Sequence, residues 1–378
     1  MKFRCERDEL LNGVQFASRA ISNRATLPVL SGLKIEANED GRVSLAATDL
    51  ELTMETAIRA AVDEPGRAIV PGRLFGEMTR SLGAGQVTVG AGEAEVEIGS
   101  GRGQFRVKAL APDDYPALPL DDPTPSGESV EVSVDAPVLT GALSQVFRAA
   151  SADETRQILT GVLCEIDEGS LTLAATDSYR LAVRKLEAPG AKGRRDVVLP
   201  SRTLSELARA LGSGASVSAS VKENLVAFTI GQAGNDGQTL EQATIGSRFI
   251  EGEFPKYRQL LPEGYPNKLE IDRDALLEVT KRVGLLAQNN LPVKLQLGSE
   301  LEVSAHTPDV GEGQEIIEAD YSGDPLVIAF NPQFLYDGVS AIQSSRVTID
   351  VADGLKPAII KGADDTDFTY LLMPVRLS

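Results

Sequence analysis

The sequence LAATD occurs twice in this chain, at residues 45–49 and again at 173–177. Two neighbouring stretches repeat in the same order: VLSGLKIEA at 29–37 matches ILTGVLCEI at 158–166, and VPGRLFGEM at 70–78 matches LPSRTLSEL at 199–207. All three matches share an offset of 128 or 129 residues. Self-similarity at so long a period indicates homologous domains rather than a solenoid of small repeats.

A third copy is weaker but keeps the order. RDALL at 273–277 resembles RDELL at 7–11, LEVSAHTPD at 301–309 stands in place of the LAATD strand, and FNPQFLYDGV at 330–339 replaces the 70–78 segment. Proline-rich stretches at 118–129 and 254–268 read as connectors. We therefore predict three homologous domains, which are 1–122, 129–253 and 267–378.

Each copy has the same predicted elements. An amphipathic helix comes first, because Leu10, Leu11, Val14, Ala17 and Ile21 recur at helical spacing. Alternating strands follow, as in residues 87–110, with GSGRG at 99–103 read as a hairpin turn rather than a phosphate-binding loop. The six predicted helices span 7–24, 72–82, 136–150, 201–211, 273–288 and 332–346. Two helices and many antiparallel strands per copy predict an α+β fold in which helices cover one face of the sheets.

The composition indicates a globular protein and argues against membrane-spanning, secreted and disulfide-rich classes. The chain has 378 residues with 42% hydrophobic and 24% charged side chains, which are globular values. It contains no apolar run of about 18 residues, and its charged N-terminus lacks a signal-peptide pattern. Cys5 and Cys164 make no disulfide framework and are expected to be inert, half-buried thiols. We expect a cytoplasmic protein without a membrane partner.

The sequence gives little support for an enzymatic function. His306 is the only histidine, so neither a zinc cluster nor a Ser-His-Asp triad can form, and no metal or cofactor is expected. The alternative is an enzyme that uses Asp49 and Asp177, which follow the two LAATD strands. Aspartate after a strand more commonly stabilises a turn. We therefore predict that the protein is not an enzyme.

Charge is distributed unevenly. The net charge is −18, yet the six predicted helices carry 12 Lys and Arg against 7 Asp and Glu, and the remaining chain carries 25 against 48. Basic helices in an acidic chain indicate a surface for a polyanion; ordinary variation between solvated helix faces is the alternative. If helices about 10 Å wide lined a ring, six would leave a bore of about 9 Å and twelve about 28 Å. Only a dimer could then surround duplex DNA.

Five segments carry a family resemblance: the MKF start, RATLPVLSGL at 24–33, ATDSYRLAV at 175–183, EFPKYRQLLP at 253–262 and LLMPVRL at 371–377. At these separations, and with the threefold repeat, the whole chain resembles the bacterial beta sliding clamp, the beta subunit of DNA polymerase III. The resemblance implies a head-to-tail dimeric ring, helices inside and sheets outside. Such a ring encircles duplex DNA without sequence specificity and is a processivity factor.

The resemblance also implies site residues. Arg24, Arg80, Arg202 and Arg209 match basic family positions for DNA binding, and Lys281 and Arg282 are added from their predicted helix; solvated surface charge is the alternative for each. The dimer interface would join Phe105 and Val107 of one chain to Leu285 and Leu286 of the other, where intradomain core is the alternative.

A pocket for peptides of the replicative polymerase, the clamp loader and other repair and replication proteins is implied at sixteen positions. They are Leu159, Thr176, Tyr179, Arg180, Leu181, Pro255, Leu291, Asn331, Phe334, Leu355, Pro357, Leu372, Met373, Pro374, Val375 and Arg376. Gln259 replaces a basic residue found in some relatives, and Tyr179 stands where histidine is common. The rival to this function is a three-domain scaffold without a DNA role.

Overall fold

The computed structural model describes residues 1–22, 27–118, 130–212, 216–222, 224–233, 240–261, 264–288 and 291–377. The chain forms two compact units that do not coincide with the three sequence repeats. Unit 1 comprises Met1–Thr140, Ala188–Arg194 and Arg202–Phe249, and unit 2 comprises Gly141–Glu187, Arg195–Ser201 and Ile250–Ser378. The middle repeat is thus divided between them.

Unit 1 contains two antiparallel sheets. The five-stranded sheet has the order β5 (Ala61–Glu64), β1 (Lys2–Glu6), β7 (Gln86–Ala91), β8 (Glu95–Ser100), β9 (Gly103–Lys108). The eight-stranded sheet has the order β10 (Val130–Asp135), β15 (Ser216–Val221), β16 (Leu225–Ala233), β17 (Leu240–Arg248), β4 (Leu52–Arg59), β3 (Arg42–Thr48), β2 (Gly32–Ala37), β6 (Gly66–Pro71). Because β17 pairs with β4, strands of the first and second repeats share one sheet.

Unit 2 has the same construction. Its nine-stranded sheet runs β14 (Arg195–Pro200), β11 (Gly161–Asp167), β12 (Ser170–Thr176), β13 (Arg180–Glu187), β26 (Phe368–Leu372), β25 (Ala358–Gly362), β24 (Arg346–Val351), β18 (Asn267–Asp272), β22 (Asp320–Ser322). Its four-stranded sheet runs β21 (Gly311–Ile317), β20 (Leu301–Thr307), β19 (Val293–Leu297), β23 (Leu326–Phe330). Here β13 pairs with β26, which joins the second and third repeats.

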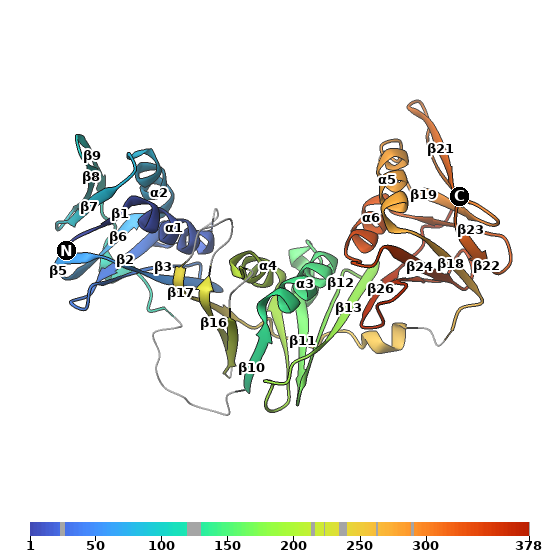
Figure 1. The fold of residues 1–378 in the computed structure, drawn as a ribbon, viewed down its shortest axis with the longest axis horizontal. Helices are drawn as coiled ribbons and strands as arrows, with labels where there is room; N and C mark the ends of the chain where they lie inside the picture. The colour runs from blue at the N-terminus through green and yellow to red at the C-terminus, as the bar shows by residue number, and fades with distance from the viewer. Residues whose placement is uncertain are drawn as a thin grey trace. The chain divides into compact units, whose positions relative to one another are not determined.

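The helices lie against these sheets (Figure 1). The α-helices are α1 (Arg7–Ala17), α2 (Gly72–Ser81), α3 (Ala136–Val146), α4 (Ser201–Ala210), α5 (Arg273–Gly284) and α6 (Pro332–Ser340). Short 3₁₀ helices are η1 (Ser18–Ala20), η2 (Pro28–Ser31), η3 (Pro112–Asp114), η4 (Phe147–Ala149), η5 (Glu154–Thr160) and η6 (Tyr257–Leu260). In unit 1, α1 packs against α2, and in unit 2, α5 packs against α6.

The predicted elements are largely present. Leu10, Leu11, Val14, Ala17 and Ile21 are all buried, as the helical spacing indicated. The predicted helix over 7–24 is too long, because α1 ends at Ala17 and a 3₁₀ turn follows. The other predicted helices begin at the predicted residues and end one to six residues early. The α+β prediction is correct.

The structure also shows the 99–103 turn and the environments of the two cysteines. The 99–103 segment is a hairpin turn: Ser100 pairs with Gly103, and Gly101 adopts φ 55° in the left-handed region that glycine tolerates. Cys5 and Cys164 are buried rather than half-buried, and burial raises the pKa of each thiol to about 12. Both are therefore protonated and unreactive.

Candidate functional site

The turn after the LAATD strand of the middle repeat is held by its own side chains. Asp177 Oδ1 accepts the backbone N–H groups of Tyr179 and Arg180 at 2.9 and 3.0 Å. Thr176 Oγ1 accepts the N–H of Ser178 at 3.1 Å and donates to the carbonyl of Arg180 at 2.6 Å. Ser178 adopts φ 80°. This geometry leaves Tyr179 61% exposed and directs Arg180 into the protein.

The first repeat forms the same turn. Asp49 Oδ1 accepts the N–H groups of Glu51 and Leu52 at 3.2 and 2.8 Å, and Leu50 adopts φ 80°. Both aspartates therefore stabilise strand-end turns, as carboxylates at such positions commonly do. Their equivalent placement reflects the repeat, so it does not support a pair of catalytic carboxylates.

Arg180 is fully engaged inside unit 2. Its Nε donates to Asp177 at 3.0 Å, its Nη1 to Asp337 at 2.6 Å and its Nη2 to the carbonyl of Arg148 at 2.6 Å. The guanidinium also lies 4.3 Å from the centre of the Phe334 ring. Asp337 and Phe334 belong to α6, so Arg180 holds that helix against the β12–β13 turn. These bonds use three of its five N–H donors, one on each nitrogen, and fix the guanidinium as part of the wall of the site.

The C-terminal tail is fixed beside this turn. Arg180 and Leu372 pair across β13 and β26, and the N–H of Met373 continues the ladder by donating to the carbonyl of Tyr179 at 2.8 Å. The N–H of Val375 donates to the carbonyl of Ala329 at the end of β23, also at 2.8 Å. Two backbone bonds thus hold residues that would otherwise fray. Met373 remains 38% exposed.

The connector between the second and third repeats is tied to β11. Glu165 accepts both Nη groups of Arg258 at 2.6 Å and the hydroxyl of Tyr257 at 2.6 Å. Burial, followed by this hydrogen bond, raises the pKa of Tyr257. Tyr257 joins a buried apolar cluster that includes Leu181 and Leu371. The connector therefore has a fixed path, which leaves Leu260 51% exposed.

All sixteen predicted pocket residues lie in unit 2, but they differ in exposure. The buried members are Leu159, Thr176, Arg180, Leu181 and Leu372. The partly buried members are Leu291, Asn331, Phe334, Pro357, Pro374 and Val375, and the exposed members are Tyr179, Pro255, Leu355, Met373 and Arg376. Exposed and partly buried members can meet a ligand directly, whereas the buried ones form its support. Asn331 also caps α6 by accepting two N–H groups.

Three supporting residues were not predicted from the sequence. Asp337 binds Arg180 from 157 positions away, Glu165 anchors the connector, and Leu260 presents an exposed apolar side chain. A signal for Asp337 was present, because it stands five residues after the first residue of α6, where α4 carries Glu206. No comparable motif marks Glu165.

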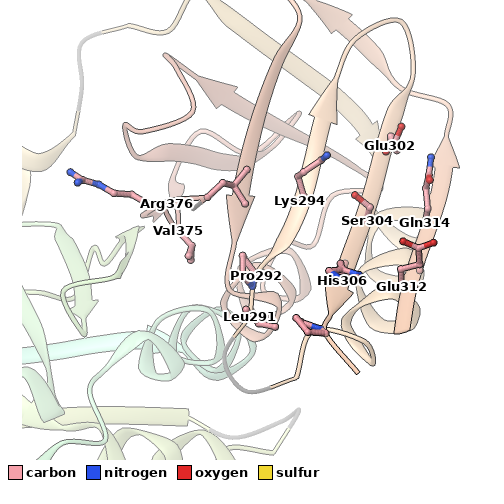
Figure 2. Close-up of a pocket in the computed structure, with 14 residues that line it drawn as sticks. Leu291, Pro292, Lys294, Glu302, Ser304, His306, Glu312, Gln314, Val375 and Arg376 are labelled. Carbon is pink, nitrogen blue, oxygen red and sulfur yellow. The ribbon is translucent and has the colours of Figure 1, made fainter. Parts of the chain in front are cut away.

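A hollow of about 880 Å³ adjoins the tail in unit 2. Figure 2 shows its floor, which consists of side chains on one face of β19, β20 and β21. Leu291, Val375 and Arg376 line this hollow and also belong to the predicted pocket. His306 lies on its floor, opposite Glu312 on the neighbouring strand.

The predicted DNA-binding cations have different environments. Arg24 lies outside the described residues. In unit 1, Arg202 pairs with Asp49 and donates to the carbonyl of Arg19 at 3.0 Å, and Arg209 pairs with Glu206 at 3.1 Å. These bonds partly neutralise the two arginines.

The other three candidates are all exposed. Arg282 on α5 pairs with Glu278 at 3.1 Å and with Glu315 at 2.8 Å, and its hydrogen bond lowers the pKa of Glu315. Arg80 on α2 and Lys281 on α5 have no ion pair with any residue in the described part of the chain. Of the predicted cations, these two therefore offer the least compensated charge.

The predicted interface residues lie at two sheet edges. Phe105 and Val107 are on β9, the last strand of the five-stranded sheet, and are 39% and 8% exposed. Leu285 follows α5 and is 72% exposed. Leu286 packs against β21, where a Cβ on Gly313 would lie 2.8 Å from its side chain. Phe105 and Leu285 thus present apolar surface, whereas Val107 is mostly core.

Comparison with known proteins identifies the family. Models of the DNA polymerase III beta subunit match in chain order: the N-terminal domain at residues 1–119, the central domain at 133–256 and the C-terminal domain at 258–376. The chain is 35% identical to the beta sliding clamp of Streptomyces coelicolor, and the match covers 100% of both chains. This chain belongs to the beta sliding clamp family.

Other sliding clamps are also similar to this chain over its full length. The chain is 34% identical to the beta sliding clamp of Staphylococcus epidermidis over 100% of this chain and 99% of that one. The crystal structure of the DNA polymerase sliding clamp from Bacillus subtilis matches with a TM-score of 0.89 and 28% identity, and the DNA polymerase III beta subunit from Thermotoga maritima with 0.88 and 26%, both over 100% of each chain.

The fold is therefore the three-domain α+β clamp fold, and the protein is the processivity subunit of DNA polymerase III rather than a catalyst. Sliding-clamp membership associates it with DNA and with the polymerase. Within the described residues, no helix meets the length and apolar character required to span a membrane.

Proposed function

We propose that two copies of this chain close head to tail into a ring that encircles duplex DNA and tethers the replicative polymerase through the pocket of unit 2. The observation that carries the proposal is an unused pair of strand edges. β4, β13 and β21 are equivalent strands, because each follows a turn with one left-handed non-glycine residue, at Leu50, Ser178 and Asp309.

The partners of these strands are also equivalent, since β17, β26 and β9 are each the last strand of a predicted domain. β4 pairs with β17 and β13 pairs with β26 within the chain. β21 and β9 end their sheets in the described part of the chain. A third pairing of the same kind, β21 with β9 of a second copy, supports a heterologous contact that closes when two copies complete the circle.

Charge favours this pairing. Arg102, Arg106 and Lys108 lie on β9 or in its turn, whereas Glu315 lies on β21; Arg106 and Glu315 also form ion pairs within the chain, with Glu97 and Arg282. Opposite charges on facing strands contribute specificity and speed association. Exposed apolar side chains at Phe105 and Leu285 would be covered in the same contact.

DNA contact would be electrostatic and independent of sequence. Arg80 and Lys281 are the strongest candidates, because they are exposed and uncompensated among the described residues. Lysine and arginine on phosphates position a protein without reading bases. Weak contacts suit a ring that must slide.

The pocket would capture peptides from the polymerase, the clamp loader and other replication and repair proteins. Exposed Met373, Leu355 and Leu260 offer an adaptable apolar surface, and the Arg180–Asp337 bond and the fixed connector keep it preformed. A preformed site loses less conformational entropy on binding.

The test is retention on DNA after loading by a clamp loader and ATP, with solution mass measured in parallel. A dimer should stay on closed circles and leave when the circles are linearised. A monomer, or release that ignores DNA ends, would contradict topological binding and favour a scaffold role.

A further inference from the structure

The hollow beside the tail differs chemically from the proposed peptide pocket. Its floor is formed by alternating residues of three strands, which point away from the core: Lys294 on β19, Glu302, Ser304 and His306 on β20, and Glu312 and Gln314 on β21. An apolar rim lies at the side of the tail. A polar floor with an apolar entrance suits an amphipathic segment rather than a purely apolar one.

The charges of the floor are uncompensated. Glu302 and Glu312 form no ion pair with a residue in the described ranges, and neither does Lys294. Figure 2 shows the Arg376 side chain extending away from the sheet, so its guanidinium does not neutralise the floor. Two carboxylates against one ammonium leave a net negative surface, which favours a basic ligand group.

The hollow is continuous with the proposed pocket. Leu291, Val375 and Arg376 line both, and the Val375 N–H is fixed to the carbonyl of Ala329 on β23. A chain that leaves the pocket across Val375 meets the row formed by Lys294, Ser304 and Gln314, which pair across neighbouring strands. The three strands are separated by two spacings of about 4.8 Å, which roughly three extended residues cover.

We infer that this hollow is a second subsite for partner peptides: it takes a short flank of the captured peptide and selects a basic side chain through Glu302 or Glu312. The inference rests on the proposed peptide capture. The two carboxylates lie at opposite ends of the floor, about 13 Å apart along the strands, so either can receive a lysine or arginine of the flank. The β21 edge can still pair with a second copy, because floor side chains stand perpendicular to the sheet.

The experiment uses the full-length dimer and fluorescent 20-residue peptides that tile the replicative polymerase of the same organism. Binding that is lost when residues 373–378 are deleted identifies a tile that uses the pocket. That tile is then shortened from each end, and its basic flanking residues are replaced by glutamine. Affinities are measured on wild type, on Glu302→Gln/Glu312→Gln and on the matched control Glu300→Gln, an exposed carboxylate outside the hollow.

We expect the double variant to weaken the full tile about threefold to tenfold, as for one or two exposed ion pairs, and to leave the shortened tile unaffected. E300Q should bind both like wild type. Equal binding of the full tile to wild type and double variant would overturn the subsite while leaving the pocket intact. Absence of any tile sensitive to the tail deletion would overturn the proposed peptide capture itself, and the subsite with it.

Discussion

The two sheet junctions within the chain have one backbone design but different side chains. At β4–β17 in unit 1, Asp49 meets Arg202, whose side chain is 47% exposed. At β13–β26 in unit 2, Arg180 lies between Asp177 and Asp337, and all three side chains are at most 14% exposed. The repeat alignment places Leu52 at the position of Arg180. The same turn can thus carry an ion pair with a half-exposed arginine or a fully buried network.

The buried network lies at the junction where we propose the peptide pocket. In unit 2, Arg180 fixes α6, and with it Phe334 and Asn331, beside the tail and the connector. In unit 1, the exposed Arg202 bridges Asp49 and the carbonyl of Arg19 without such a surface. Buried ion pairs contribute little net stability but are costly to break, so they suit a wall that must keep one geometry.

The largest expected effect comes from breaking each junction in turn. Arg180→Ala leaves Asp177 and Asp337 buried without a partner and should lower the free energy of unfolding by about 3–5 kcal/mol. Arg202→Ala removes a half-exposed guanidinium, while Asp49 keeps its two backbone hydrogen bonds, so the loss should be about 0–1 kcal/mol. Urea unfolding of both variants measures the difference. Equal losses would mean that burial does not distinguish the junctions.

The salt dependence of DNA affinity should distinguish cations that form ion pairs within the chain from cations that do not. Arg80→Ala/Lys281→Ala should reduce the slope of log affinity against log salt concentration by about 2, because each lost phosphate contact removes about 0.9. Arg202→Ala/Arg209→Ala removes charges that acidic neighbours already compensate, so the change should be smaller. Titration with duplex DNA at several salt concentrations measures both slopes. A larger change for the second pair would show that the ion pairs open on DNA.

The smallest effect at neutral pH concerns the two thiols, one in each unit, which influence stability only in alkaline solution. The pKa of Cys5 and of Cys164 is raised to about 12 by burial, with Glu9 and Glu6 adding to the effect at Cys5. Since the unfolded thiol titrates near 9.0, its stabilising protonated state is fully present below that pH and is lost as pH rises toward 12.

Each thiol should therefore lower stability by about 1.4 kcal/mol per pH unit within this window. Comparing the pH dependence of unfolding between wild type, Cys5→Ala and Cys164→Ala isolates each contribution from tyrosine titration. Added salt should reduce the Cys5 effect, which is partly Coulombic, more than the Cys164 effect. A Cys164 contribution as salt-sensitive as that of Cys5 would contradict burial as its cause.

Local signals were sufficient for much of the fold. Helical spacing around Val14, the glycine turn at Gly101 and the strand-end aspartates each depend on neighbours within a few residues, so periodicity and turn chemistry reveal them. Helix ends were predicted less well, because α1 ends at Ala17 with Ser18 as its C-cap, where neither glycine nor proline signals a stop.

The sequence by itself determined the threefold repeat, the α+β class and the turns, because these depend on short-range patterns copied three times along the chain. Only the tertiary structure decided that Arg180 is buried against Asp337, 157 positions away, and that Arg202 is compensated by Asp49, 153 positions away. Only it revealed the hollow that the tail and β19–β21 form together. A charged side chain is paired or unpaired depending on which distant residue lies beside it. Packing of the sheets and helices determines that neighbour.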